Sequence, residues 1–193
     1  MDRNRGRFMI THSELVEMFG EQDVYRTPES VLGEKIKHAK SRSLMSETGI
    51  PGQLGNVLIV SESAVTSELK RMVDRYSYEL PGLPRNPLSL YWLASAAGGD
   101  VCVDGVTGEV YFVKSDYVPP VICINSDLES FIRCMLVIEE AALRDEIPES
   151  MSDIESISRD LVNDISIFEE HVHSEPSGFW RQVIEFYLQE LSE

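Results

Sequence analysis

Three short apolar runs between residues 89 and 113 are separated by glycine-containing turns, and this pattern constrains the fold more than any other feature. The runs are Ser89–Ala96, Val101–Asp104 and Glu109–Val113. Gly98-Gly99 and Gly105-Val106-Thr107-Gly108 lie between them and supply the backbone freedom that tight hairpins need. Because parallel strands need much longer connections, turns this short predict antiparallel pairing.

Two further segments are typical of strands. Val57–Val60 is a continuous apolar run and predicts a buried strand, while Val121–Ile124 follows the pair Pro119-Pro120. Between the first of these and the hairpins, residues 81–87 are rich in proline. Proline fits neither a helix interior nor a central strand, so this segment is expected to be a rigid connector.

Helical periodicity dominates both ends of the chain. Thr11 and Glu14 predict a capping box for a short helix that Gly20 ends. A second capping box is expected between Ser126 and Glu129, before a helix with a wide apolar face. Further helices are predicted at 27–48, 65–76, 154–168 and 179–191.

These segments together predict a single α+β domain, with a mainly antiparallel sheet flanked by N-terminal and C-terminal helices. Its 193 residues are enough to bury one core without metal or disulfide crosslinks. Residues 1–8 are expected to be a loose basic tail, residues 9–193 the domain, and Met9 an alternative start. Trp92 and Trp180 fall on predicted core positions, so both are expected to be mostly buried.

The charge is distributed unevenly along the sequence. The net charge is −16, and all of it arises after residue 85, where the chain contains five basic and twenty-one acidic residues. Residues 1–85 hold twelve of each kind. A strongly negative chain does not favour direct binding of nucleic acid or of an anionic membrane. The excess of acid favours solubility or a basic protein partner.

Cysteine usage indicates a reducing compartment. Cys102, Cys123 and Cys134 are odd in number, lack C-x-x-C spacing and lie among apolar residues, so they are expected to be buried thiols. The basic N-terminus is not followed by an apolar segment of useful length, and the chain lacks the ~18 consecutive apolar residues of a membrane helix. A cytoplasmic location is therefore expected.

A search for catalytic and metal-binding patterns finds none that is specific. The sequence lacks the nucleophile-elbow, P-loop, zinc-protease and dinucleotide-binding motifs. His171-Val172-His173 is the nearest approach to a metal cluster, but no third ligand can be named, so no metal or cofactor is expected. The segment Asp104–Glu109 predicts a hairpin turn rather than a calcium loop. The chain is thus not expected to be an enzyme.

The order of several short segments resembles the SUKH superfamily, and within it the group numbered four, which are immunity proteins of bacterial polymorphic-toxin systems. The similarity spans roughly residues 12–145, with a weaker match in the Phe179-Trp180 helix. The segments that carry it are Phe19-Gly20, Gly49-Ile50-Pro51, Val101–Asp104, Thr107–Tyr111 and Ile124–Phe131. The acidic region 149–175 has no counterpart in the family pattern.

The resemblance implies a cytoplasmic, non-catalytic protein that binds and blocks a co-encoded toxin, often a nuclease or nucleic-acid deaminase. A toxin that acts on a polyanion is typically basic, and an acidic surface would match it. Two alternatives remain: a regulatory or scaffold module of the same fold, and a small-molecule enzyme with an unrecognised pocket. The sequence leaves the oligomeric state undetermined.

The candidate partner-binding residues are acidic side chains after residue 85. One set flanks the predicted sheet turns and is expected to be exposed: Asp100, Asp104 and Glu109. The other set lies on the predicted helix 154–168, namely Asp153, Glu155, Asp160 and Asp164, with Glu169 and Glu170 assigned to the same face. The turn residues rank slightly higher, because loops on a rigid sheet are common binding positions.

Overall fold

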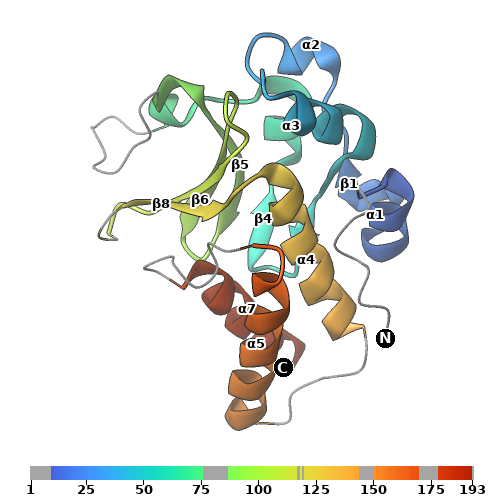
Figure 1. Cartoon of the computed structure of the whole chain (residues 1–193), viewed down its shortest axis with the longest axis vertical. Helices are drawn as coiled ribbons and strands as arrows, with labels where there is room; N and C mark the ends of the chain where they lie inside the picture. Colours follow the sequence, from blue (N-terminus) through green and yellow to red (C-terminus); the bar gives the residue numbers. More distant parts are fainter. Residues whose placement is uncertain are drawn as a thin grey trace.

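The computed structural model describes residues 10–75, 87–116, 118, 120–143, 150–169 and 178–192 (Figure 1). Its centre is a six-stranded antiparallel sheet in the order β3-β4-β5-β6-β7-β8. The strands are β3 (Gln53–Leu54), β4 (Leu58–Val60), β5 (Leu90–Ala96), β6 (Gly99–Asp104), β7 (Val110–Val113) and β8 (Val121–Asn125). The predicted mixed α+β class and the antiparallel strands after residue 57 are therefore confirmed. Strand β3 was not predicted, because two residues leave too short a pattern to detect.

The sheet separates two apolar clusters, because successive side chains on a strand point to opposite faces. Val101 pairs with Phe112 on one face and contributes to the large core. Cys102 pairs with Tyr111 on the other face, where a smaller cluster also contains Leu90. Asp100 and Asp104 share the Cys102 face, since they lie two residues before and after it.

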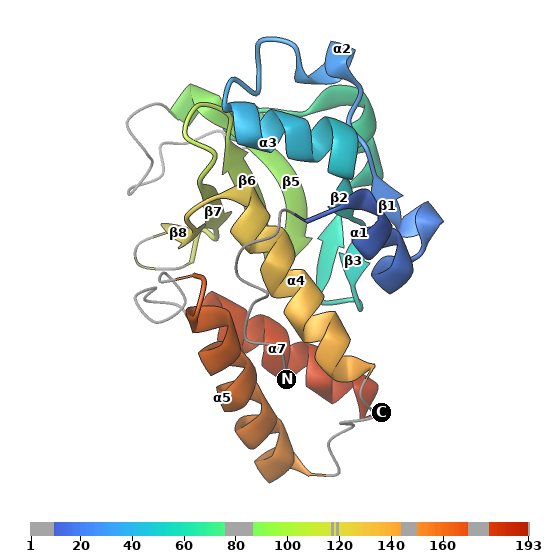
Figure 2. The same ribbon diagram turned by 45° about the vertical axis from the view of Figure 1, so that its right-hand side comes forward.

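The C-terminal helices cover the face of the large core (Figure 2). They are α4 (Leu128–Ala142), α5 (Met151–Ser166) and α7 (Phe179–Leu191), and each contacts the other two. Phe179 packs on Phe112 of β7 with a ring-centroid distance of 4.8 Å, and Trp180 packs on Phe131 of α4 at 5.4 Å. The predictions of these helices from apolar spacing are confirmed, with boundaries shifted by a few residues.

The start of α4 differs from the predicted capping box by one residue. Asp127, not Ser126, is the N-cap, and its carboxylate accepts a hydrogen bond from the Ser130 backbone N–H at 2.8 Å. Ser130 takes the position of the expected Glu129 in the box. Glu129 is not part of the capping box and forms ion pairs with Lys40 and Arg133 instead.

The N-terminal region contains one predicted helix and one that is broken. Helix α1 (His12–Phe19) begins with the predicted Thr11–Glu14 capping box and ends at Gly20. Helix α2 (Glu29–Leu32) is followed by α3 (Ala39–Ser43) and the π-helical turn η2 (Leu44–Thr48). One helix over 27–48 was therefore a wrong prediction.

The break has two causes. Gly33 ends α2 in a backbone conformation with φ 39°, which glycine adopts easily. The backbone N–H groups of Lys37 and His38 then donate to the carbonyl oxygen of Gly105 in the β6–β7 turn, at 2.6 and 2.9 Å. These tertiary hydrogen bonds replace those that a continuous helix would form.

The predicted helix 65–76 is also divided. A π-helical turn, η3 (Ala64–Glu68), ends at Leu69 with φ 43°, and a single 3₁₀ turn, η4 (Met72–Asp74), follows. Other short elements were not predicted: η1 (Glu21–Asp23), η5 (Pro87–Ser89), and the two-residue strands β1 (Val24–Tyr25) and β2 (Ile50–Pro51), which pair with each other.

The two tryptophans differ in burial. Trp180 is fully buried, as expected, and its indole N–H donates to the side-chain oxygen of Asn125 at 3.1 Å. Trp92 is only partly buried, because its indole ring faces the smaller cluster and stacks under the Arg75 guanidinium at 3.9 Å. Of the three free thiols, Cys102 and Cys134 are buried as predicted, whereas Cys123 is half-buried.

We expect Trp180→Ala to lower the free energy of unfolding by about 3–5 kcal/mol, because it removes a buried aromatic ring and leaves Asn125 without its donor. Urea denaturation monitored by circular dichroism measures the change. Phe186→Ala on the same helix is the matched control, since Phe186 is 48% exposed and should cost much less. An equal effect of the two substitutions would show that α7 is not docked through Trp180.

Candidate partner-binding surface

Asp104 is part of the β6–β7 turn rather than an exposed ligand-binding group. Its residue is 4% exposed, so the expectation of an exposed side chain was wrong. The carboxylate accepts hydrogen bonds from the backbone N–H groups of Val106 and Thr107 at 2.7 and 3.1 Å, and from the Ser89 hydroxyl at 2.9 Å. Aspartate is favoured at this position because its side chain satisfies turn N–H groups.

Asp100 is likewise engaged within the fold, and the prediction that it is exposed was also wrong. It is 7% exposed and forms an ion pair with Arg75 at 3.3 Å. Glu109, in the turn, is half-buried and accepts hydrogen bonds from the hydroxyls of Thr107 and Tyr111 at 2.8 and 3.0 Å. Burial, together with this bond to Glu109, raises the pKa of Tyr111.

Helix α5 presents the exposed acidic residues that the sequence predicted. Asp153, Asp160 and Asp164 are spaced by seven and four residues, so they form one stripe along the helix, which we call the α5 stripe. Within the described parts of the chain, none of the three forms an ion pair. Ile167 is 82% exposed and continues the stripe one turn beyond Asp164.

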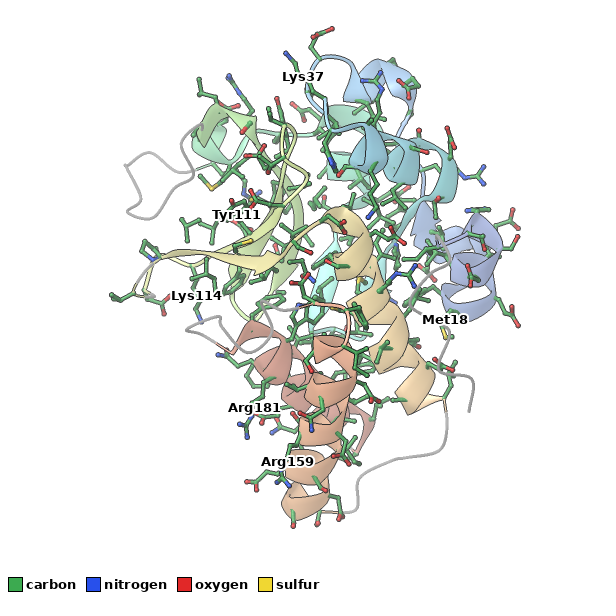
Figure 3. The ribbon with its side chains drawn as sticks, viewed as in Figure 1. Met18, Lys37, Tyr111, Lys114, Arg159 and Arg181 are labelled. Carbon is green, nitrogen blue, oxygen red and sulfur yellow. The ribbon has the colours of Figure 1, made fainter. Side chains whose placement is uncertain are left out.

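Glu155 is exposed but lies on a different flank of α5. Its position is two residues from Asp153, which turns it away from the stripe, and four residues from Arg159. Figure 3 shows Arg159 and Arg181 on the same side of the α5–α7 pair. The pKa of Arg181 is raised by Glu185 first and by Glu155 to a smaller extent. Glu155 therefore belongs to the flank of α5 that carries Arg159, and we exclude it from the stripe.

The two candidate sets do not form one surface. The β6–β7 turn is hydrogen-bonded to the segment between α2 and α3, as described above, at the opposite end of the molecule from α5 (Figure 1). Asp100 and Asp104 also lie on the sheet face opposite to the large core. A partner can contact the α5 stripe without touching the turn.

Glu169 was predicted to lie on the exposed acidic face, and this prediction was wrong. It is 1% exposed, and its Oε2 lies 2.6–3.2 Å from donors on Asn125, Ser126 and Ser130. One of these donors is the Ser126 backbone N–H at 2.8 Å, just before α4, where a negative charge is favourable. Glu169 follows the end of α5, so helical periodicity does not place it on the exposed face. Its donors lie on residues 125–130, which the sequence around Glu169 cannot indicate.

A second charged cluster joins α3 to the start of α4. The Lys40 ammonium lies 2.6 Å from the Asp127 carboxylate and 2.8 Å from that of Glu129, which also pairs with Arg133 at 2.6 Å. Burial alone would raise the pKa values of Asp127 and Glu129, but hydrogen bonds and attraction from these cations outweigh it and lower both. For Lys40, burial is likewise outweighed by the two carboxylates, and its pKa is raised.

Two further features bear on function: the histidines considered as metal ligands and the search for membrane-spanning helices. His171 and His173 lie outside the residues that the structure describes, as does Glu170. Elsewhere in the chain, the described histidine, cysteine and acidic side chains form no group able to hold a metal ion. Among the described helices, none has the length and apolar character needed to cross a bilayer.

A mixed α+β fold that presents an exposed acidic helix stripe favours the class of proteins that act by binding. Comparison with protein families agrees with this class: residues 10–186 match the SUKH-4 immunity protein family. The match covers most of the chain, so the protein belongs to this family of immunity proteins, which bind a cognate toxin. Neither a curated protein nor a solved structure matches the chain.

The lowered pKa values of Asp127 and Glu129 predict a pH-dependent contribution to stability. Their pairing with Lys40 stabilises the fold fully above their ordinary pKa of about 4, and is lost as pH falls through their lower folded-state values. Lys40→Met should therefore cost about 1 kcal/mol at pH 7, because Lys40 is partly exposed, and progressively less below pH 4.

Urea titrations of both proteins at several pH values measure this difference. Lys37→Met is the control, because Lys37 pairs only with exposed Glu34 within the described chain. A Lys40→Met cost that is unchanged between pH 7 and pH 3 would contradict the assignment.

Proposed function

We propose that this chain neutralises a co-encoded nucleic-acid-targeting toxin, a nuclease or deaminase, by binding its basic surface through the α5 stripe in the cytoplasm. Membership of the SUKH-4 immunity protein family supports the binding of a toxin. The single observation that carries the choice of surface is the exposure of Asp153, Asp160 and Asp164 without ion pairs in the described chain. No direct contact with nucleic acid is required.

The contrast with the turn residues supports α5 as the main contact. The carboxylates of Asp100 and Asp104 already bond to Arg75 and to turn N–H groups, so a partner would have to displace those contacts. We propose a supporting role for Asp100, Asp104 and Glu109: the last two hold the β6–β7 turn in shape, and Asp100 fixes the start of β6 through Arg75 and Ser95. Partner binding at that turn would then use its exposed residues, such as Val106, which is 53% exposed.

The α5 stripe has the composition of a binding site for a basic protein. Its three carboxylates attract a cationic surface over distance, which raises the association rate. Ile167 adds an exposed apolar side chain at the end of the stripe, and burying such a group slows dissociation. Glu155, on the flank of Arg159, is proposed as a peripheral contact only.

Association kinetics with the co-encoded toxin test the proposal. Asp160→Lys combined with Asp164→Lys should lower the association rate at least about tenfold at low salt, with a smaller loss as salt screens the charges. The control is Glu17→Lys on α1 with Glu21→Lys in η1, which changes the net charge equally at exposed positions away from the stripe. Thermal unfolding of each variant checks that it is folded.

Equal rates for the stripe and control variants at every salt concentration would exclude the α5 stripe as the contact. In that case the toxin could still bind elsewhere, and the family assignment would not change. Failure of the unmodified protein to bind any toxin encoded beside its gene would overturn the function itself.

A further inference from the structure

A hollow of about 360 Å³ lies at the end of the molecule that carries α2 and α3, away from the α5 stripe. Its wall is formed by the segment after α2, the η3–η4 connection and the start of β5. Seven residues line it: Lys35, Glu68, Leu69, Lys70, Arg71, Asp74 and Tyr91. Its volume is within the range of small-molecule sites in proteins.

The charges around the hollow leave one cation without an acidic partner. Lys70 pairs with Glu68 at 3.3 Å, and Arg71 forms two hydrogen bonds with Asp74 at 3.1 and 3.2 Å. The Lys35 ammonium donates instead to the backbone carbonyl of Glu68, and no carboxylate of the described chain pairs with it. The lining therefore carries one uncompensated positive charge in a protein of net charge −16.

Tyr91 adds a hydrogen-bond donor to the lining of the hollow. The residue is 8% exposed and lines the hollow, yet within the described residues its hydroxyl forms no hydrogen bond. The hydroxyl oxygen is not among the fully buried, unpartnered polar atoms of the described chain, so it is accessible to solvent and to a ligand in the hollow. Here the hydroxyl can donate a hydrogen bond to an anion held by Lys35 and Arg71.

The groups that line the hollow are held by the fold. The Lys70 carbonyl accepts a hydrogen bond from the Trp92 backbone N–H at 2.9 Å, and Arg71 forms a β-bridge with Tyr91. Leu69, which precedes Lys70 and also lines the hollow, is buried and has a positive φ of 43°, which a leucine keeps only where its surroundings fix it. A preformed arrangement of donors lowers the cost of binding.

We propose that this hollow binds the phosphate group of a small anionic molecule, with Lys35 and Arg71 as cationic contacts and the Tyr91 hydroxyl as a donor. Lysine and arginine are the usual protein partners of phosphate. The volume exceeds that of a phosphate alone, so an organic phosphate is the expected occupant. The site is separate from the α5 stripe and does not depend on toxin binding.

Isothermal titration calorimetry with inorganic phosphate, adenosine 5′-monophosphate and adenosine tests the proposal on the full chain. Phosphate and the monophosphate should bind, and adenosine should not. Equal affinity for the first two assigns the site to the phosphate group alone, whereas tighter binding of the monophosphate supports an organic phosphate. Binding of adenosine as tight as that of the monophosphate, or no binding of either phosphate compound, would overturn it.

Variants locate the binding in the hollow. Tyr91→Phe keeps the ring and removes the hydroxyl, so it should weaken binding of the monophosphate about tenfold or more, since it loses a hydrogen bond to a charged group. Lys35→Met should weaken it at least as much, whereas the control Lys37→Met, outside the hollow, should have little effect. Far-UV circular dichroism confirms folding. Tyr91→Phe and Lys35→Met affinities equal to that of Lys37→Met would show that binding occurs elsewhere.

Discussion

The buried carboxylate of Glu169 is the interaction on which the arrangement of the C-terminal helices depends. A carboxylate removed from water is costly unless hydrogen bonds and a favourable field replace its hydration. At Glu169 the donors come from the end of β8 and the first turn of α4, through Asn125, Ser126 and Ser130. The end of α5 is therefore tied to the start of α4, although the two are about forty residues apart in sequence.

Asn125 extends this junction to α7. Its amide N–H group donates to Glu169, and its carbonyl oxygen accepts from the Trp180 indole N–H. One fully buried side chain thus satisfies polar groups on both α5 and α7, and the aromatic contacts of Trp180 and Phe179 pack α7 on α4 and the sheet. The α5 stripe is consequently presented on a fixed support, and a fixed binding surface loses less entropy when a partner binds.

Local signals in the sequence predicted much of the fold. Glycine turns gave the hairpins of β5, β6 and β7, and apolar spacing gave α4, α5 and α7. The failures occur where distant residues decide the outcome. The predicted helix 27–48 is broken partly because the backbone N–H groups of Lys37 and His38 donate to the Gly105 carbonyl. In the same region, Lys40 forms ion pairs with Asp127 and Glu129, which lie almost ninety residues away in sequence.

The candidate site shows the same limit. The sequence identified the acidic residues of α5 correctly as exposed, because helical periodicity separates them from the apolar face. It could not distinguish them from Asp100, Asp104 and Glu169, whose carboxylates are buried with their own donors. Acidic composition alone does not show whether a carboxylate is available to a partner; its burial does, since Asp153 stays exposed although it accepts a hydrogen bond from the Ser150 hydroxyl at 2.7 Å.

Carboxylate footprinting tests most directly whether the α5 stripe contacts the toxin. Carbodiimide-activated labelling with glycine ethyl ester, read by mass spectrometry, reports the solvent access of each aspartate and glutamate in the free protein and in the complex. The account predicts that labelling of Asp153, Asp160 and Asp164 falls on toxin binding, while that of Glu17 on α1 stays the same. Unchanged labelling of all three aspartates in a saturated complex would contradict it.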